Sequence, residues 1–266
     1  SFPTRRSSDL ILLLASKIEN AAADIHLDLS EATGITEIKR FGNNGTYDSD
    51  FANCKYLKSI VLPNCLKTLG DYAFWYCKYL ESVTLPENLT AIGNGVFVSC
   101  ENLKTLTIPD SVTSFGYMMC YRCSSLTEFT IPQGMTEIPD EAFNYCTSLT
   151  SIVIPDFVTS IGGGAFLGCT ALQNISLSSS LTKIEHMAVY QCTNLKNITI
   201  PATVVKIGAN CFAYCENLKS VSFDDTSTWY YTSSYYTGGI QISVTWPSTN
   251  ARYFTSTYVD KRWYKE

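Results

Sequence analysis

The sequence has 266 residues, of which 45% are hydrophobic and 16% are charged, with a formal net charge of −5 at pH 7. This composition excludes a disordered chain, and the longest clean apolar run, Leu10 to Ala15, is far shorter than the about 18 residues of a membrane span. Nineteen Lys and Arg against 24 Asp and Glu leave no basic excess, so neither a nucleic acid nor an anionic membrane is an expected partner.

The N-terminal segment is predicted to contribute little to function. Residues 1–10 resemble translated sequencing-adapter DNA and are interpreted as a non-native leader. Arg5 and Arg6 before Leu10 to Ala15 imitate a signal peptide, but that apolar stretch is shorter than the about 7 to 15 residues expected. No signal segment is therefore assigned with certainty.

Residues 11–53 are predicted to form an N-terminal cap with an irregular first repeat. The composition from Leu10 to Ala23 favours a helix, and Ile25, Leu27 and Leu29 then alternate as a first strand. The sequence Asn43-Asn44-Gly45 indicates a loop before the regular pattern begins.

A 23-residue repeat then occupies residues 54–223. Each repeat contains a Cys followed three positions later by a Leu, without exception in eight copies. The cysteines are Cys54, Cys77, Cys100, Cys123, Cys146, Cys169, Cys192 and Cys215. A fixed period of this length predicts a solenoid.

Each repeat is predicted to contain one short strand. Apolar residues lie six and eight positions after each Cys, as Ile152 and Ile154 do after Cys146, and a Pro usually follows. The pleat directs these two side chains inward and the one between them outward, while the proline ends the strand. A later apolar residue, such as Ile161, usually precedes a Gly, which we expect in a turn that needs positive φ.

One repeat cannot fold alone. About six buried side chains give about 12 kcal/mol, while ordering the backbone costs roughly 1 to 2 kcal/mol for each residue of the repeat. Stacked coils must therefore share a core and a hydrogen-bonded sheet, and their ends must be covered. The pattern predicts a single solenoid.

Residues 224–266 are predicted to form a small β cap. This segment contains no Leu and no Cys, but many Thr, Ser and aromatic residues, and Ile240, Ile242, Val244 and Trp246 alternate as a strand. Its aromatic residues include Trp229, Tyr230, Tyr231, Tyr235, Tyr236, Trp246, Trp263 and Tyr264. They are interpreted as the core of the cap, with stacking on sugar rings as the alternative.

The unit beginning Cys77-Lys78-Tyr79-Leu80-Glu81-Ser82-Val83-Thr84-Leu85-Pro86 resembles the BspA-like leucine-rich repeat of bacterial cell-surface proteins. The resemblance covers about residues 51 to 223. It implies a curved right-handed leucine-rich repeat solenoid with one short parallel strand per coil. It also implies a protein exposed on or secreted from a cell, which binds other proteins and in some cases mediates adhesion to a host.

No catalytic or metal-binding constellation is expected. Cys120 and Cys123 form one CxxC motif, but cysteines in a row along a stack do not converge on a metal as zinc ligands must. We expect buried structural thiols, with disulfides and metal or redox roles as alternatives. Only two histidines occur, and the candidate acids Asp140, Glu141, Glu128 and Glu137 occupy ordinary surface positions. The prediction is a non-enzyme without cofactors.

The outward strand positions are the candidate binding surface. They form two columns in which small hydroxyl side chains predominate, a composition that also suits a solvated β face without any ligand. Near the middle of the stack we single out a predicted patch of six residues, Thr105, Thr107, Glu128, Thr130, Ser151 and Val153.

The sequence thus predicts a non-enzymatic, extracellular or cell-surface module that binds a protein partner, such as a host surface or matrix protein, and is itself a monomer. Two alternatives stay open. One is a structural surface or spacer solenoid without a specific ligand. The other is carbohydrate binding through the C-terminal aromatic residues.

Overall fold

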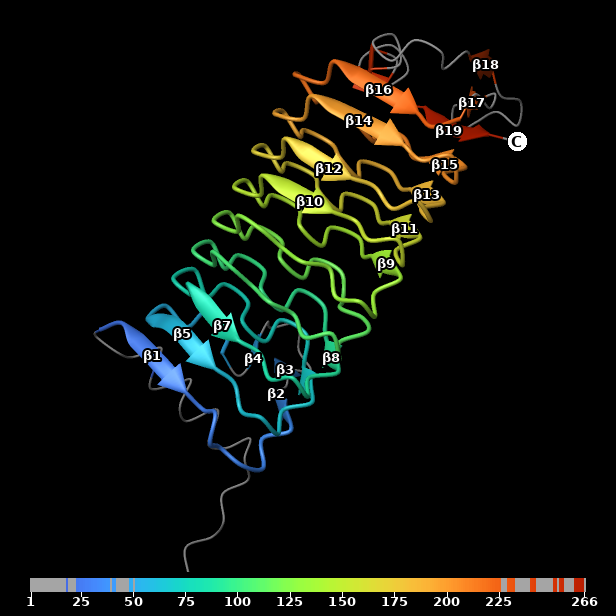
Figure 1. Ribbon diagram of the computed structural model, residues 1–266. Helices are drawn as coiled ribbons and strands as arrows, with labels where there is room; N and C mark the ends of the chain where they lie inside the picture. The colour runs from blue at the N-terminus through green and yellow to red at the C-terminus, as the bar shows by residue number, and fades with distance from the viewer. Residues whose placement is uncertain are drawn as a thin grey trace, which may run out of the picture. The chain divides into compact units, whose positions relative to one another are not determined.

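Parallel strands recur with a period of 23 residues in the computed structural model (Figure 1), so the predicted leucine-rich repeat solenoid is confirmed. The chain forms two compact units, residues 1–134 and 135–266, which are described separately. The structure describes residues 18, 23–38, 40, 41, 48, 49, 51–225, 229–232, 240–242, 251, 252, 254, 255 and 261–265.

The first unit contains two parallel ladders. The longer strands pair in the order β1 (Ile25–Asp28), β5 (Leu57–Val61) and β7 (Ser82–Thr84). Two-residue strands form the second ladder, in the order β2 (Glu37–Ile38), β6 (Thr68–Leu69) and β8 (Ala91–Ile92). The strands β3 (Arg40–Phe41) and β4 (Asp48–Ser49) form an antiparallel pair.

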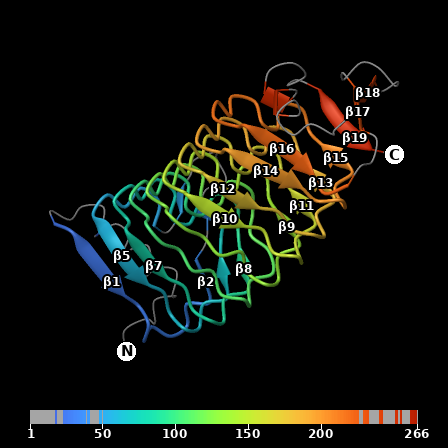
Figure 2. The ribbon, with the colours of Figure 1, turned by 45° about the horizontal axis from the view of Figure 1, so that its top comes forward.

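The second unit repeats this arrangement. Its longer strands form two pairs, β10 (Ser151–Val153) with β12 (Asn174–Ser176), and β14 (Asn197–Ile200) with β16 (Ser220–Phe223). The short strands are β9 (Glu137–Ile138), β11 (Ser160–Ile161), β13 (Lys183–Ile184) and β15 (Lys206–Ile207). Figure 2 shows the two ladders of this unit on different sides of the coils.

The C-terminal strands extend the second ladder of this unit. β19 (Arg262–Lys265) pairs antiparallel with β15 and with β17 (Trp229–Thr232), which in turn pairs with β18 (Ile240–Ile242). The predicted strand from Ile240 is therefore present, while Val244 and Trp246 lie outside the described residues. At the other end, β1 contains Ile25 and Leu27 as predicted, whereas almost all of the predicted helix from Leu10 lies outside the described residues.

The core consists of columns of identical or similar side chains. The repeated Cys and Leu residues are buried, and phenylalanines of neighbouring coils stack face to face. The ring centroids of Phe74 and Phe97 are 5.6 Å apart in the first unit, and those of Phe143 and Phe166 are 5.5 Å apart in the second. Burying these columns provides the hydrophobic stabilisation that one repeat lacks.

The prediction of a strand in every coil is wrong for two coils of the first unit. The segments around Leu106 and Phe129 keep the inward and outward alternation but form no strand. All six coils from residue 54 onward that do form the longer strand have a β-branched residue at this position, namely Ile60, Val83, Ile152, Ile175, Ile198 and Val221. β-Branched side chains stiffen the chain in the extended form, which explains the difference for Leu106.

The predicted role of the turn glycines is also wrong. Gly93, Gly116, Gly162 and Gly208 are not among the residues with positive φ. A Cβ at Gly162 would lie 2.6 Å from the backbone nitrogen of Asp140 in the preceding coil. Glycine is therefore required by the close approach of two coils rather than by a left-handed turn.

Left-handed backbone occurs instead in two other columns, one and five residues before each repeated Cys. These positions contain glycines such as Gly164, but mostly residues with side chains. The residues with side chains include Tyr72, Tyr76, Ser99, Arg122, Tyr145, Gln191 and Tyr214, whose φ angles lie between 57° and 63°.

Candidate interaction surface

Four residues of the predicted patch lie in the first unit. Thr105, Thr107, Glu128 and Thr130 are all exposed, on either side of buried inward residues. The predicted outward orientation of these four side chains is therefore present, although their coils form no strand.

The remaining two residues of the predicted patch lie in the second unit, on β10. Ser151 is exposed and the side chain of Val153 is 64% exposed, while Ile152 between them is buried. The six residues are thus divided between the two units, and each unit presents its own part of the outward columns.

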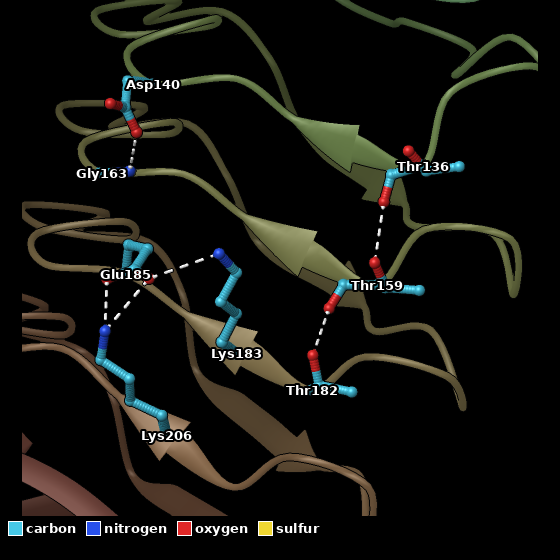
Figure 3. Close-up of polar contacts among 8 residues, drawn as sticks. All are labelled: Thr136, Asp140, Thr159, Gly163, Thr182, Lys183, Glu185 and Lys206. Atoms are coloured by element: carbon cyan, nitrogen blue, oxygen red, sulfur yellow. Dashed lines mark hydrogen bonds and ion pairs between the residues drawn. The ribbon is translucent and has the colours of Figure 1, made fainter.

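Hydroxyl groups near the second ladder play a different role from those of the predicted patch. The Thr159 hydroxyl donates to the carbonyl of Thr136 at 3.1 Å, and the Thr182 hydroxyl donates to the carbonyl of Thr159 at 3.0 Å (Figure 3). Thr105, Thr107 and Thr130 form no such side-chain hydrogen bond within the described part of the chain. Their hydroxyls are therefore available to a partner.

Charged side chains in the second unit also join neighbouring coils. Asp140 accepts a hydrogen bond from the backbone N–H of Gly163 at 2.6 Å (Figure 3). Glu185 forms ion pairs with Lys206 at 3.1 Å and with Lys183 at 3.8 Å. The contacts of Asp140 with Gly163 and of Glu185 with Lys206 link coils, whereas Lys183 and Glu185 belong to the same coil. Exposed ion pairs of this kind contribute little stability individually.

Two of the four carboxylates considered as candidate acids, Asp140 and Glu141, have structural contacts. Besides the bond from Gly163 to Asp140, Glu141 accepts a hydrogen bond from the amide of Asn144 at 3.2 Å. Among the described residues, no group of three or more His, Cys, Asp and Glu side chains could hold a metal ion. No helix in the described ranges is long and apolar enough to cross a membrane.

All eleven cysteines are free thiols, and all but Cys65 are buried, so the predicted burial of the repeated cysteines is confirmed. Where the Sγ of a repeated Cys donates a hydrogen bond, the acceptor is the carbonyl of a residue in the preceding coil. Cys169 donates to Phe143 at 3.1 Å and Cys192 to Phe166 at 3.2 Å. Burial raises the pKa of Cys169 to about 12. The thiols of the repeated cysteines are therefore poor nucleophiles and poor metal ligands.

A hollow of about 390 Å³ lies in the second unit at β12 and β14. These two strands are neighbours along the stack but belong to separate pairs, so the longer ladder is interrupted between them. The lining includes Asn174, Ser176, Asn197 and Thr199, which are outward residues of these strands, together with Asp224. Such a polar, uncovered hollow extends the outward face without defining a ligand.

Exposed tyrosines form clusters that the sequence analysis did not identify. In the first unit, the Tyr72 hydroxyl lies 3.2 Å from that of Tyr117, and Lys78 lies over the ring of Tyr76. In the second unit, the ring centroids of Tyr190 and Tyr214 are 5.0 Å apart. The feature of the sequence that could have identified such clusters is the recurrence of Tyr directly before the repeated Cys.

The aromatic residues of the C-terminal strands are mostly not available to a ligand. Trp229 and Trp263 are buried, and Trp263 packs against Phe254 with 4.3 Å between ring centroids. They form part of a local core, as the favoured interpretation of this segment expected. Tyr230 and Tyr264 are half-buried and stack on each other, whereas Tyr235, Tyr236 and Trp246 lie outside the described residues.

Comparison with known families agrees with this architecture. The family described as BspA type leucine-rich repeat region matches residues 45–155 and 136–259. The chain belongs to this family. A search of the curated proteins finds no match.

Solved structures with a similar fold come from bacteria. One is a leucine-rich cell surface protein from Faecalibacterium prausnitzii A2-165, with 28% identity, a TM-score of 0.51, and coverage of 85% of this chain and 55% of that protein. Another is a leucine-rich repeat protein from Bacteroides ovatus ATCC 8483, with 22% identity, a TM-score of 0.49, and coverage of 71% and 64%. The pneumococcal vaccine antigen PcpA has 21% identity, a TM-score of 0.48, and coverage of 72% and 60%. The chain thus spans 55% to 64% of the length of these three proteins.

Proposed function

We propose that this chain is a non-enzymatic recognition module, exposed on a cell surface or secreted, that binds a protein partner through the two outward columns, whose side chains lie on either side of a buried residue in each coil. One observation carries the proposal. The outward hydroxyls Thr105, Thr107 and Thr130 are exposed and make no side-chain hydrogen bond in the described ranges, whereas Thr159 and Thr182 use theirs to join coils.

Two further features support this function. Because the coils beneath the surface are locked by buried Cys, Leu and Phe columns, the outward side chains are held in place before binding, which lowers the entropic cost of association. In the second unit, Val153 adds an exposed apolar side chain next to Ser176 of the paired strand. Membership of the family and the likeness to a bacterial cell-surface protein support a surface location.

The main alternative is a structural spacer whose outward columns bind nothing specific. A spacer would have the same core and the same coil-to-coil contacts, so only binding measurements distinguish it from a recognition module. For the alternative of carbohydrate binding through the C-terminal aromatic residues, Trp229 and Trp263 are unsuitable because they are buried.

The test is a double substitution in the first unit, Thr107→Arg with Thr130→Arg. Both side chains are exposed, so the added bulk and charge should leave the fold intact. Binding of the full chain to a panel of purified host matrix and cell-surface proteins would be measured by surface plasmon resonance. We expect at least one partner, whose affinity falls about tenfold or more in the double variant.

The matched control is Thr159→Arg with Thr182→Arg in the second unit, which changes exposed threonines of the second ladder. This control should bind the partner normally if it remains folded by circular dichroism. Unchanged affinity of a folded Thr107 and Thr130 double variant would place the site elsewhere, and binding to no protein of the panel would favour the spacer.

A further inference from the structure

Two tyrosines in the second unit occupy positions that disfavour large side chains. Tyr145 and Tyr214 both precede a repeated Cys and have left-handed backbone, with φ of 57° and 58°. Bulky residues are rare in this conformation, whereas Gly168 in the same column adopts it without strain. An exposed aromatic side chain at such a position does not stabilise the fold through burial, so strain there points to another role.

The neighbouring coils are arranged to bring these rings together. A Cβ at Gly168 would lie 2.7 Å from the ring of Tyr145, which belongs to the preceding coil. Because Gly168 has no side chain, the Tyr145 ring has space beside it. Tyr190 follows, and its ring centroid is 5.0 Å from that of Tyr214. Burial and the nearby hydroxyls of Tyr214 and Tyr145 raise the pKa of Tyr190. The three side chains form a tyrosine row that spans four coils, one of which contributes Gly168 and no tyrosine.

The backbone beneath the tyrosine row is fixed. Tyr145 donates its N–H to the carbonyl of Leu167 at 2.7 Å, and Gly168 donates to the carbonyl of Tyr190 at 2.8 Å. One coil further, Gln191 donates to the carbonyl of Ala213 at 2.8 Å. The rings are thus attached to a rigid support, and binding needs little reordering of the backbone.

The surroundings of the tyrosine row are polar and mostly uncharged. Gln191 and Thr193 are half-buried beside Tyr190, and Asn217, which donates to the carbonyl of Thr193 at 2.8 Å, is exposed. Glu216 and Lys219 are the charged side chains in the segment directly after Cys215, residues 216–219. In the first unit, by contrast, Lys78 lies 4.5 Å from the ring centroid of Tyr76.

We propose that the tyrosine row, Tyr145, Tyr190 and Tyr214, binds a neutral polysaccharide whose sugar rings are joined by equatorial linkages. The flat C–H face of a pyranose ring stacks on an aromatic ring, and its hydroxyls suit the amide and hydroxyl groups beside the row. Coils of a parallel stack advance by about 4.8 Å, which is close to the advance per sugar in such an extended chain. The centroids of the Tyr190 and Tyr214 rings are separated by a similar distance, 5.0 Å, and the two ring planes are tilted by 58° to each other.

This site is independent of the proposed protein-binding columns, because it uses different side chains and a different class of ligand. Affinity electrophoresis of the full chain would be run in gels containing hydroxyethyl cellulose or mixed-linkage β-glucan. Soluble starch, whose axial linkages coil the chain, and polygalacturonate, which is charged, are the comparison polymers. We expect retardation by the β-linked neutral polymers and little by the other two.

Tyr214→Gly and Tyr190→Ala should each weaken retardation by the β-linked polymers about tenfold, as expected for loss of one aromatic stacking contact. Tyr190→Phe keeps the ring and should retain most of the binding. Tyr76→Gly in the first unit is the matched control, since it removes an exposed tyrosine with the same backbone conformation, φ 63°, and should bind as the parent does.

Circular dichroism melts separate binding from folding. Because glycine suits the left-handed backbone, Tyr214→Gly should melt no earlier than the parent. No retardation by a neutral β-linked polymer, or unchanged retardation in folded Tyr190→Ala and Tyr214→Gly, would overturn the proposal. If the chain binds no polysaccharide and these variants lose binding to a purified protein partner, the tyrosine row is instead a protein interface.

Discussion

The repeated cysteine combines two properties that the interior of each coil requires. It is small and apolar enough to be buried, and its S–H can donate a second hydrogen bond to a backbone carbonyl of the preceding coil, as Cys192 does to Phe166, whose oxygen also accepts from the N–H of Cys169. Serine would donate more strongly but is more costly to bury, and alanine could not donate at all. The residue type therefore follows from packing and hydrogen bonding rather than from redox or metal chemistry.

The buried thiols make the fold sensitive to alkaline pH. Burial raises the pKa of Cys169 and of Cys215 to about 12, from an ordinary value of 9.0. The thiol form is thus favoured by folding, so this stabilisation is complete below about pH 9 and is lost as the pH rises from there through 12. Each thiol should add a slope of about 1.4 kcal/mol per pH unit in that window.

Urea unfolding of the parent and of Cys169→Ala at several pH values between 8 and about 11 would measure this slope. The variant should be less stable at pH 8 but should lose stability less steeply above pH 9. Equal slopes in the two proteins would show that Cys169 does not titrate differently on folding.

Two glycines of one turn should respond differently to the same substitution. In Gly162→Ala the new Cβ would meet the backbone of Asp140 at 2.6 Å, and we expect a loss of about 2 to 3 kcal/mol from overpacking. In Gly164→Ala the nearest atom is 3.4 Å away, so the cost is the left-handed backbone alone, about 1 kcal/mol. Chemical denaturation of the two variants gives the comparison, and a larger loss for Gly164→Ala would contradict the close-approach explanation.

At the scale of the element, the strands depend on the shape of one inward side chain. The coils centred on β-branched residues such as Val83 form the longer strand, and the coil centred on Leu106 does not. Phe129 is a special case, because its ring packs edge to face against Phe115, with 6.2 Å between centroids. That contact places a large ring where neighbouring coils have smaller residues.

Leu106→Ile should therefore extend the ladder beyond β7 at little cost in stability. The substitution keeps the side-chain volume and adds the preference for extended backbone, so we expect a change in unfolding free energy of less than about 1.5 kcal/mol. Amide hydrogen exchange should show slower exchange for Thr107 and its neighbours. Unchanged exchange would mean that the side chain at 106 does not decide whether the strand forms.

The inward and outward assignment could be predicted from the sequence, because it depends on alternation within one coil. The second ladder could not, since its two-residue strands, such as β11, are too short for any alternation. Likewise, the approaches of Gly162 to Asp140 and of Gly168 to the ring of Tyr145 join residues of different coils. A repeat period identifies which residues share a column, but not how close those columns come.

At the scale of the whole molecule, the stability of each coil depends on its neighbours. Leu149 is fully buried in the second unit, so Leu149→Asp would place an unpaired charge in the core between coils. We expect a loss of at least about 4 kcal/mol and unfolding of much of that unit. Thermal melts followed by circular dichroism would show a large shift.

Thr150→Asp is the matched control for Leu149→Asp, because it introduces the same charge at the next residue, which is exposed. Its effect should stay within about 0.5 kcal/mol. If both variants melt alike, the assignment of inward and outward residues in this coil is incorrect.

The threonine contacts between coils have a consequence for how such proteins vary during evolution. Thr182 stands to Thr159 as Thr159 stands to Thr136, in hydrogen bonding and in spacing. Excision of residues 159–181 would join Val158 to Thr182 and present the same hydroxyl to the same carbonyl. Unequal recombination between tandem repeats can thus lengthen or shorten the gene by whole coils while leaving compatible surfaces at the new junction. The length of the solenoid can therefore change while the fold of each coil stays the same.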